Sequence, residues 1–124
     1  MNKEQTAFVF PGQGSQRVGM GVELSRQYEV ARRTFEETHD VLHLDIADIC
    51  FHGPDYLLNS TAYTQPAILT VSIAALRVLV QEKGLTPHQV AGHSLGEYSA
   101  LVAAQSLEFA QAVQLVRNRG HYME

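Results

Sequence analysis

The sequence feature that most constrains the fold is Gly92-His93-Ser94-Leu95-Gly96, which lies between a short apolar segment and a segment of helical character. A serine between two glycines, where a strand passes into a helix, is typical of a nucleophile elbow. The glycines permit a sharp turn, the serine hydroxyl is exposed, and the N–H of Leu95 is left without an intrahelical partner. The motif predicts an α/β chain with Ser94 as candidate nucleophile. The alternative is that Ser94 only caps the helix, with Glu97 completing a capping box.

The second informative stretch is the glycine-rich loop of residues 11–16, PGQGSQ, which follows the apolar segment Thr6–Phe10. A phosphate-binding loop is excluded, because Arg17 replaces the third glycine of a dinucleotide fingerprint and Met20 stands where a P-loop requires lysine. Loops at the carboxyl ends of parallel strands converge, so we expect this loop beside Ser94. Its Gln13 N–H would then join the Leu95 N–H as the second donor to an oxyanion. A plain tight turn is the alternative.

The rest of the pattern predicts a parallel sheet covered by helices. The expected elements are a buried strand over 6–10, a helix with Ala31, Phe35, Thr38 and Leu42 on one face, a turn-rich segment over 51–59, a buried helix over 64–84, a strand over 88–93, a helix over 94–105 and a final helix capped by Ser106. Thr64 is the expected N-cap of the buried helix, and Gly84 its stop. On the exposed face of the first helix, Arg32–Glu36 and Arg33–Glu37 are expected i,i+4 ion pairs.

Composition narrows the class of protein. A net charge of −4 over 124 residues argues against nucleic-acid binding. The single Cys50 excludes an internal disulfide and favours a reducing cytoplasm. The apolar run Ala67–Leu76 ends at Arg77, well short of the roughly 20 residues of a membrane span, and the polar start Met1–Thr6 is unlike a targeting signal. We therefore expect a cytoplasmic protein that is not embedded in a membrane.

Two features predict that residues 1–124 form the N-terminal portion of a larger domain. Only two strands are visible, and a two-stranded parallel sheet is not stable on its own. The last helix also reaches the end of the sequence with no glycine or proline to stop it.

Four motifs together carry a family resemblance. They are FPGQGSQ near the start, TQPA at residues 64–67, AGHSLGEYSALVAA at 91–104 and VRNRG at 116–120. In this order they resemble the malonyl-CoA:acyl carrier protein transacylases and the related acyltransferase domains of fatty acid and polyketide synthases. The resemblance implies an α/β-hydrolase-like large subdomain, with parallel strands flanked by helices, that is truncated before a ferredoxin-like small subdomain. It implies transfer of malonyl from malonyl-CoA to the phosphopantetheine thiol of acyl carrier protein through a malonyl-serine ester. It implies neither a cofactor nor a metal.

The resemblance also assigns roles to individual residues. Ser94 matches the family's nucleophile, and the amides of Gln13 and Leu95 match its oxyanion hole. Arg119 matches the residue that holds the malonyl carboxylate, for which a planar guanidinium is suited. Helical periodicity alone does not choose between Arg119 and Arg117, which lie on opposite shoulders of the apolar stripe of the last helix. The resemblance chooses Arg119 and leaves Arg117 as an ordinary surface charge.

Two features depart from the family pattern. The family's catalytic histidine lies beyond residue 124, and none of the six histidines present is promoted to general base. His93 is a candidate for lining the pocket, or a packed residue at the strand end. Gln105 stands where the family carries glycine, which predicts an altered helix end.

The alternatives left open are a serine hydrolase of the thioesterase kind, an inactive fragment, and one half of a split acyltransferase completed by a C-terminal partner chain. Fatty acid synthesis, polyketide synthesis and malonate decarboxylation all use such transferases, and the sequence does not choose among them.

Overall fold

The computed structural model describes residues 5–124, so part of the polar segment Met1–Thr6, on which the expectation of no targeting signal rests, lies outside the described residues. Two strands and seven helices follow one another within this range. Their bounds are β1 Ala7–Phe10, α1 Val22–Gln27, α2 Glu29–Leu42, α3 Ile46–His52, α4 Asp55–Leu58, α5 Thr61–Gln81, β2 Gln89–Gly92, α6 Gly96–Ala103 and α7 Phe109–Met123.

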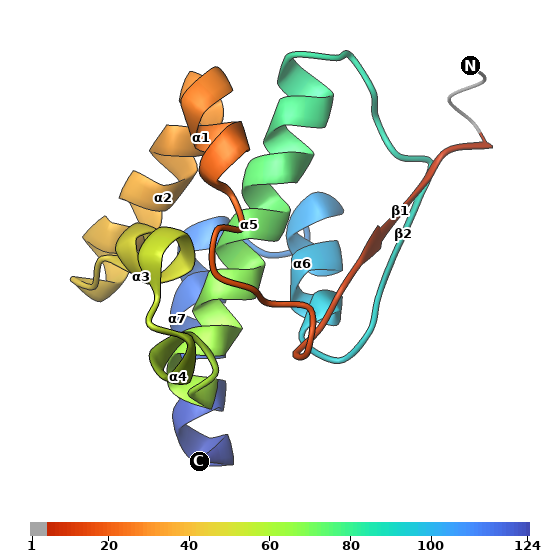
Figure 1. Cartoon of the computed structure of the whole chain (residues 1–124). Coiled ribbons are helices and arrows are strands. Elements are labelled where there is room, and N and C mark those ends of the chain that lie inside the picture. The colour runs from red at the N-terminus through yellow and green to blue at the C-terminus, as the bar shows by residue number, and fades with distance from the viewer. Residues whose placement is uncertain (1–4) are drawn as a thin grey trace.

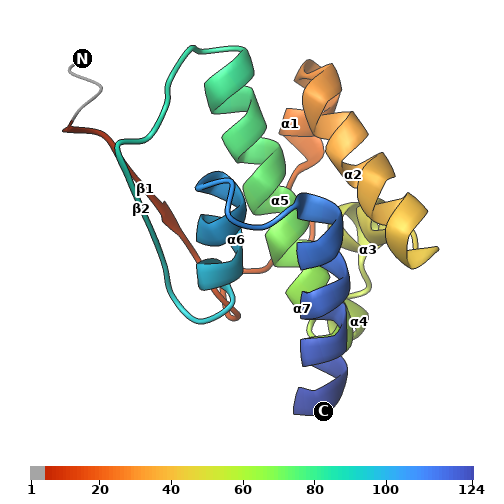
Figure 2. The same ribbon diagram turned by 180° about the vertical axis from the view of Figure 1, so that it is seen from behind.

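Helix α5 is the centre of the fold, with α2 packed along one side and α7 along another (Figures 1 and 2). Buried apolar side chains form one cluster between α5, α2 and α3, and a second between α5 and α7. The apolar composition of α5 on all its faces is explained by these two clusters, as expected for a buried helix. By length and composition α5 would also qualify as a membrane span, but 67% of that apolar window is buried inside the fold.

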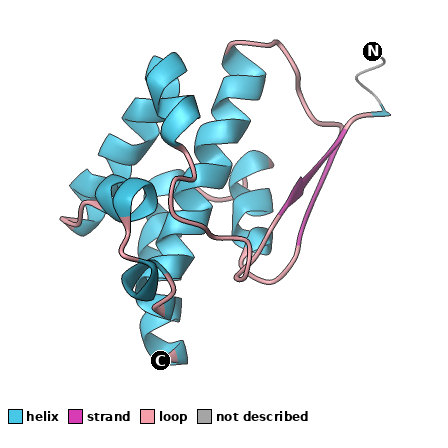
Figure 3. Cartoon of the chain, in the orientation of Figure 1, coloured by secondary structure: helices cyan, strands magenta, loops and turns pink. Residues whose placement is uncertain are grey.

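The sheet consists of β1 and β2, which pair in parallel with Ala7 opposite Gln89 and Phe10 opposite Gly92. The helices lie to one side of the sheet, and α6 contacts both strands (Figure 3). This confirms the α/β class with a parallel sheet. The expectation of a buried first strand is wrong, because only Phe10 is buried and Val9 is 75% exposed. Successive side chains of a strand point to opposite faces, and here the helices cover one face only.

Helix α2 buries the predicted face, including Ala31, Phe35 and Thr38. The two ion pairs predicted on its exposed face are wrong. Arg33 pairs with Glu29 at 2.9 Å, one turn earlier than expected. Glu37 pairs instead with Arg77 of α5, also at 2.9 Å, and Arg32 donates to the backbone oxygen of Ser25. Arg33 thus forms an i,i+4 pair with a different partner, and contacts with other elements engage Arg32 and Glu37.

The two predicted helix caps are also wrong. Helix α5 begins at Thr61 after Ser60, and the Thr64 hydroxyl donates to the carbonyl oxygens of Leu58 and Ser60 within the first turns. Helix α7 begins at Phe109 after Glu108, so Ser106 lies outside it. The predicted end of α5 is confirmed, since Gly84 follows the helix with a left-handed φ of 65°.

Candidate active site

Ser94 occupies a strained turn between β2 and α6. Its φ is 56°, in the left-handed region that non-glycine residues rarely adopt, and its side chain is exposed. A Cβ at Gly92 would collide with the carbonyl of Gly96, and a Cβ at Gly96 would collide with that of Phe10. Glycine is therefore required at both ends of the motif, so that the strand, turn and helix can pack backbone to backbone.

The capping interpretation of Ser94 is wrong. The first residues of α6 receive no side-chain cap, and the Ser94 hydroxyl accepts a hydrogen bond from Arg119 Nη2 at 3.1 Å. The backbone oxygen of Ser94 accepts from the N–H of Glu97 at 2.9 Å, which begins the helix without using the side chain. The hydroxyl therefore points away from the helix it precedes.

The loop after β1 lies against this turn, as expected from the parallel sheet. A Cβ at Gly12 would collide with the backbone oxygen of His93, so the two loops approach more closely than any other residue at position 12 would permit. The loop is held by Gln16, whose Oε1 accepts from the N–H of Gly14 and whose Nε2 donates to Asn59. This contact ties the loop to the end of α4.

The two predicted oxyanion donors lie on these adjoining loops. Within the described part of the chain, neither the N–H of Gln13 nor that of Leu95 donates a hydrogen bond. Leu95 is buried beside the elbow, whereas Gln13 is exposed. Both donors are therefore free to bind an oxygen of a ligand, which is what an oxyanion hole requires.

Arg119, and not Arg117, reaches Ser94 from α7. Besides its bond to the serine hydroxyl, its Nη1 donates to Gln65 Oε1 at 2.6 Å, and its guanidinium lies 5.7 Å from the ring centre of Tyr98. Of the two arginines that periodicity left equivalent, Arg119 is the one that contacts the candidate nucleophile. A positive charge stands beside the candidate nucleophile, half-buried and oriented by two neighbours.

Sequence reasoning missed Gln65. Its side chain is fully buried on α5, and its Nε2 donates to Gln13 Oε1 at 2.9 Å while its Oε1 accepts from Arg119. It therefore links the glycine-rich loop to the arginine beside Ser94. The available signal was a glutamine inside a helix that is otherwise apolar on all sides, because such a buried amide must find partners.

The interpretation of Arg117 as an ordinary surface charge is wrong. The residue is half-buried, its Nη1 donates to the backbone oxygen of Ala62 at 2.6 Å, and its guanidinium lies 4.7 Å from the ring centre of Tyr63. Arg117 and Arg119 thus both contact the first turns of α5, at different points.

His93 is exposed at the edge of the site, with its Nδ1 close to the position a Cβ on Gly12 would occupy. The sole hydrogen-bond partner of the Ser94 hydroxyl within residues 5–124 is the guanidinium of Arg119, which is a hydrogen-bond donor only. No group of three His, Cys, Asp or Glu side chains able to hold a metal ion lies within this range.

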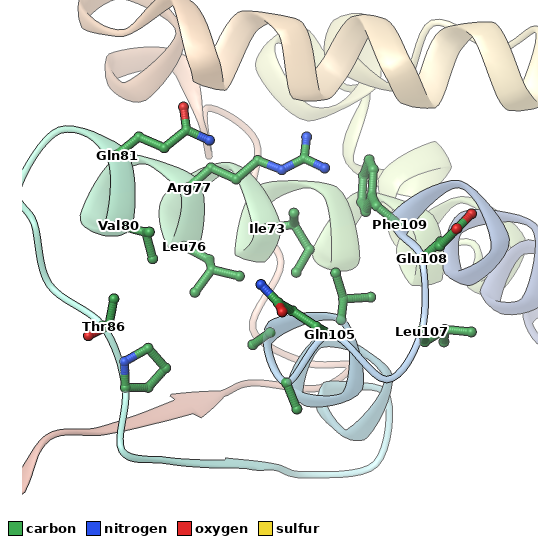
Figure 4. A pocket seen from close by; sticks show the side chains of 14 residues that line it. Ile73, Leu76, Arg77, Val80, Gln81, Thr86, Gln105, Leu107, Glu108 and Phe109 are labelled. Atoms are coloured by element: carbon green, nitrogen blue, oxygen red, sulfur yellow. The ribbon is translucent and has the colours of Figure 1, made fainter. Parts of the chain in front are cut away.

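A groove of about 660 Å³ lies elsewhere, between the C-terminal half of α5 and the connection from α6 to α7 (Figure 4). None of the predicted site residues lines it. Gln105 does, and it follows the end of α6 with a φ of 63°, in the left-handed conformation that favours glycine.

Comparisons with known proteins find relatives of this chain in both sequence and structure. The chain is 52% identical over 118 residues to the malonyl CoA-acyl carrier protein transacylase of Bacillus subtilis, a match that covers 95% of this chain and 30% of that protein. It matches the crystal structure of the Streptococcus pneumoniae MCAT with a TM-score of 0.92 at 50% identity, covering 97% of this chain and 39% of that one. A malonyl-transacylase in complex with a type II PKS acyl-carrier protein matches with a TM-score of 0.89 at 51% identity, covering 94% and 38%.

The chain therefore spans between 30% and 39% of the length of these three relatives. The sequence profile of the acyl transferase domain matches residues 7–124, which include the elbow, the glycine-rich loop and both arginines of α7. The chain belongs to the acyl transferase domain family.

Proposed function

We propose that this chain supplies the nucleophile and the carboxylate-binding arginine of a transacylase that moves malonyl from malonyl-CoA to acyl carrier protein. The observation that carries the proposal is the position of the Arg119 guanidinium, 3.1 Å from the hydroxyl of Ser94 in the elbow. A cation fixed beside a nucleophilic serine suits an acyl group that ends in a carboxylate. The names of the relatives, and the complex of one of them with an acyl-carrier protein, support the same substrate and partner.

In the first half-reaction, Ser94 Oγ attacks the thioester carbonyl of malonyl-CoA. The developing oxyanion accepts hydrogen bonds from the N–H groups of Gln13 and Leu95, each worth about 3–4 kcal/mol of transition-state stabilisation in comparable sites. The carbon–sulfur bond breaks, the serine proton passes through a general base to the leaving thiol of coenzyme A, and a malonyl-Ser94 ester remains. The phosphopantetheine thiol of acyl carrier protein then attacks this ester and regenerates the serine hydroxyl.

Arg119 selects the acyl group in this scheme. A malonyl carboxylate takes the place of the Ser94 hydroxyl on Nη2, while Gln65 keeps Nη1, so the guanidinium stays oriented as the serine becomes free to react. An acetyl group offers no carboxylate and leaves the half-buried arginine poorly paired, which disfavours its transfer.

We place residues 1–124 as the N-terminal portion of an acyltransferase domain of cytoplasmic type. The rest of the domain would extend the parallel sheet into the α/β-hydrolase-like large subdomain, add the ferredoxin-like small subdomain and provide the histidine that deprotonates Ser94. The greater length of the relatives supports this assignment. Residues 1–124 alone are accordingly expected to show negligible transacylase turnover, and appreciable turnover with intact acyl carrier protein would contradict the assignment.

The test uses the full-length protein that contains this chain, incubated with malonyl-CoA and examined by intact-mass spectrometry. The unsubstituted protein should carry a malonyl adduct that Ser94→Ala abolishes. Arg119→Ala should lower kcat/KM for malonyl transfer about 100-fold, the equivalent of a lost charge-assisted pair, and leave acetyl transfer unchanged or faster. Arg26→Ala is the matched control, because that arginine is exposed on α1 and its side chain, among residues 5–124, pairs only with Glu23.

Two results would overturn the proposal. One is a malonyl adduct that survives Ser94→Ala. The other is release of free malonate in preference to transfer to the carrier, which would favour the serine hydrolase.

A further inference from the structure

Arg117, the arginine of α7 that does not contact Ser94, meets α5 at a point where that helix lacks one backbone hydrogen bond. Pro66 lies inside α5 and has no N–H, so the carbonyl of Ala62, one turn earlier, lacks its usual intrahelical donor. Arg117 Nη1 donates to this carbonyl at 2.6 Å, and its guanidinium stacks over the neighbouring ring of Tyr63. A guanidinium from another helix thus replaces the missing backbone donor.

Gly120 of α7 and Glu124, the residue that follows α7, contact the same turn of α5. A Cβ at Gly120 would lie 2.6 Å from the carbonyl oxygen of Thr61 and 2.8 Å from the Cα of Ala62, so the helices touch backbone to backbone there. Glu124 Oε1 accepts from the N–H of Ala62 at 3.0 Å. Positions 117, 120 and 124 share one face of a helix, so these contacts hold α7 at one place along α5.

The two arginines lie on either side of this close contact. An α-helix turns by about 100° per residue. Around the axis of α7, Arg117 therefore lies about 60° from Gly120 in one direction, and Arg119 lies about 100° from it in the opposite direction. Arg117 holds the backbone of α5 on one flank, while Arg119 meets Gln65, the residue before the proline, on the other flank. Loss of the Arg117 contact removes one constraint on the rotation of α7 about its axis, and such a rotation would separate Arg119 from Gln65 and Ser94.

We propose that Arg117 is a positioning residue for Arg119, anchored on the Ala62 carbonyl that Pro66 leaves without a donor. The inference rests on the proposed function, in which Arg119 binds the substrate carboxylate. It assigns to Arg117 a contribution to malonyl selectivity without contact with the acyl group.

The experiment compares Arg117→Met in two backgrounds of the full-length protein that contains this chain, the natural Pro66 and Pro66→Ala. Methionine keeps an unbranched stem but removes every donor, and alanine at 66 restores a backbone N–H to Ala62. With Pro66, Arg117→Met should lower the folding equilibrium constant roughly tenfold, because a helix carbonyl loses its donor. With Pro66→Ala, the same substitution should cost no more than about twofold. Equal losses in both backgrounds would refute the anchor.

The readout of positioning is the NMR signals of the Gln65 side-chain amide and the Arg119 Nε–H. In the Pro66→Ala background, where stability is restored, adding Arg117→Met should still shift both signals and speed their exchange with water. Unchanged signals there would reduce Arg117 to a purely structural role and overturn the proposal. If Arg117→Met fails to fold with Pro66, the comparison is made in the Pro66→Ala background alone. Failure of Arg117→Met to fold in both backgrounds would also overturn the proposal.

A malonate titration of the same samples separates this inference from the proposed function. Arg119→Met should abolish malonate-induced shifts, and Arg117→Met should weaken them. Shifts that survive Arg119→Met would count against the carboxylate site itself. If the malonate-induced shifts are lost with Arg119→Met but unchanged with Arg117→Met, only the positioning role of Arg117 is refuted.

Discussion

Replacing Gln65 by leucine is the most direct test of the network beside Ser94. The side chain is fully buried, and leucine has nearly the same volume, so the change removes polar atoms without opening a large cavity. The bond from Arg119 at 2.6 Å is charge-assisted and contributes about 1.5–3 kcal/mol, whereas the bond to Gln13 at 2.9 Å is neutral and contributes about 0.5–1.5 kcal/mol. Gln13 is exposed and Arg119 is half-buried, so in the variant both side chains form hydrogen bonds with water that offset part of the lost stability. We therefore expect the free energy of unfolding to fall by about 2 kcal/mol.

The assay is equilibrium urea unfolding of the full-length protein that contains this chain. Gln114→Leu is the matched control, since Gln114 is an exposed glutamine of α7 that bonds only to Asn118, and it should change stability by less than about 0.5 kcal/mol. Gln65→Glu should lie between the two, because a carboxylate keeps the bond to Arg119 but cannot donate to Gln13. In the full-length protein it should also weaken malonyl transfer by neutralising the guanidinium. If Gln65→Leu costs no more than Gln114→Leu, the network does not order the site and the reasoning fails.

Three further predictions concern single positions of the same chain, each measured by urea unfolding. Gly96→Ala should lower the free energy of unfolding by about 3 kcal/mol or more, because the new methyl group meets the carbonyl of Phe10; Gly84→Ala, where space is open but φ is 65°, should lower it by only about 1 kcal/mol. Gln105→Gly should raise it by about 0.5–1 kcal/mol, since glycine adopts the φ of 63° without strain; no gain would show that the glutamine is held by its neighbours in the groove. Burial raises the pKa of the Cys50 thiol from 9.0 to about 12, so the unfolded chain releases this proton first and stability should fall as pH rises above 9; Cys50→Ala should remove that part of the pH dependence.

The elbow and the neighbouring loop could be predicted from the sequence because their requirements are local. Glycine at 92 and 96 with serine between them is the signature of one backbone geometry, and the parallel order of β1 and β2 then brings Gln13 next to it. The identity of the arginine followed from the family resemblance, and periodicity alone left Arg117 and Arg119 equivalent.

The features that the sequence did not predict depend on contacts between elements. A proline near Thr64 is typical of the first turn of a helix, but α5 begins earlier, at Thr61. The carbonyl that Pro66 leaves without a donor accepts a hydrogen bond from Arg117, far along the chain. Gln65 has no periodic signature in a helix that is buried all round. The exposure of Val9 likewise depends on which face of the sheet the helices cover.

The open face of the sheet has a practical consequence for anyone handling this chain. Within the described residues, β1 and β2 are both edge strands, so each has a row of backbone groups without a neighbouring strand, and Val9 adds a solvated apolar side chain. Such edges invite pairing with strands of other molecules. Samples of residues 1–124 should therefore be prepared dilute and checked for oligomers by light scattering before any measurement, and a lysine at position 9 is the simplest substitution to suppress self-association.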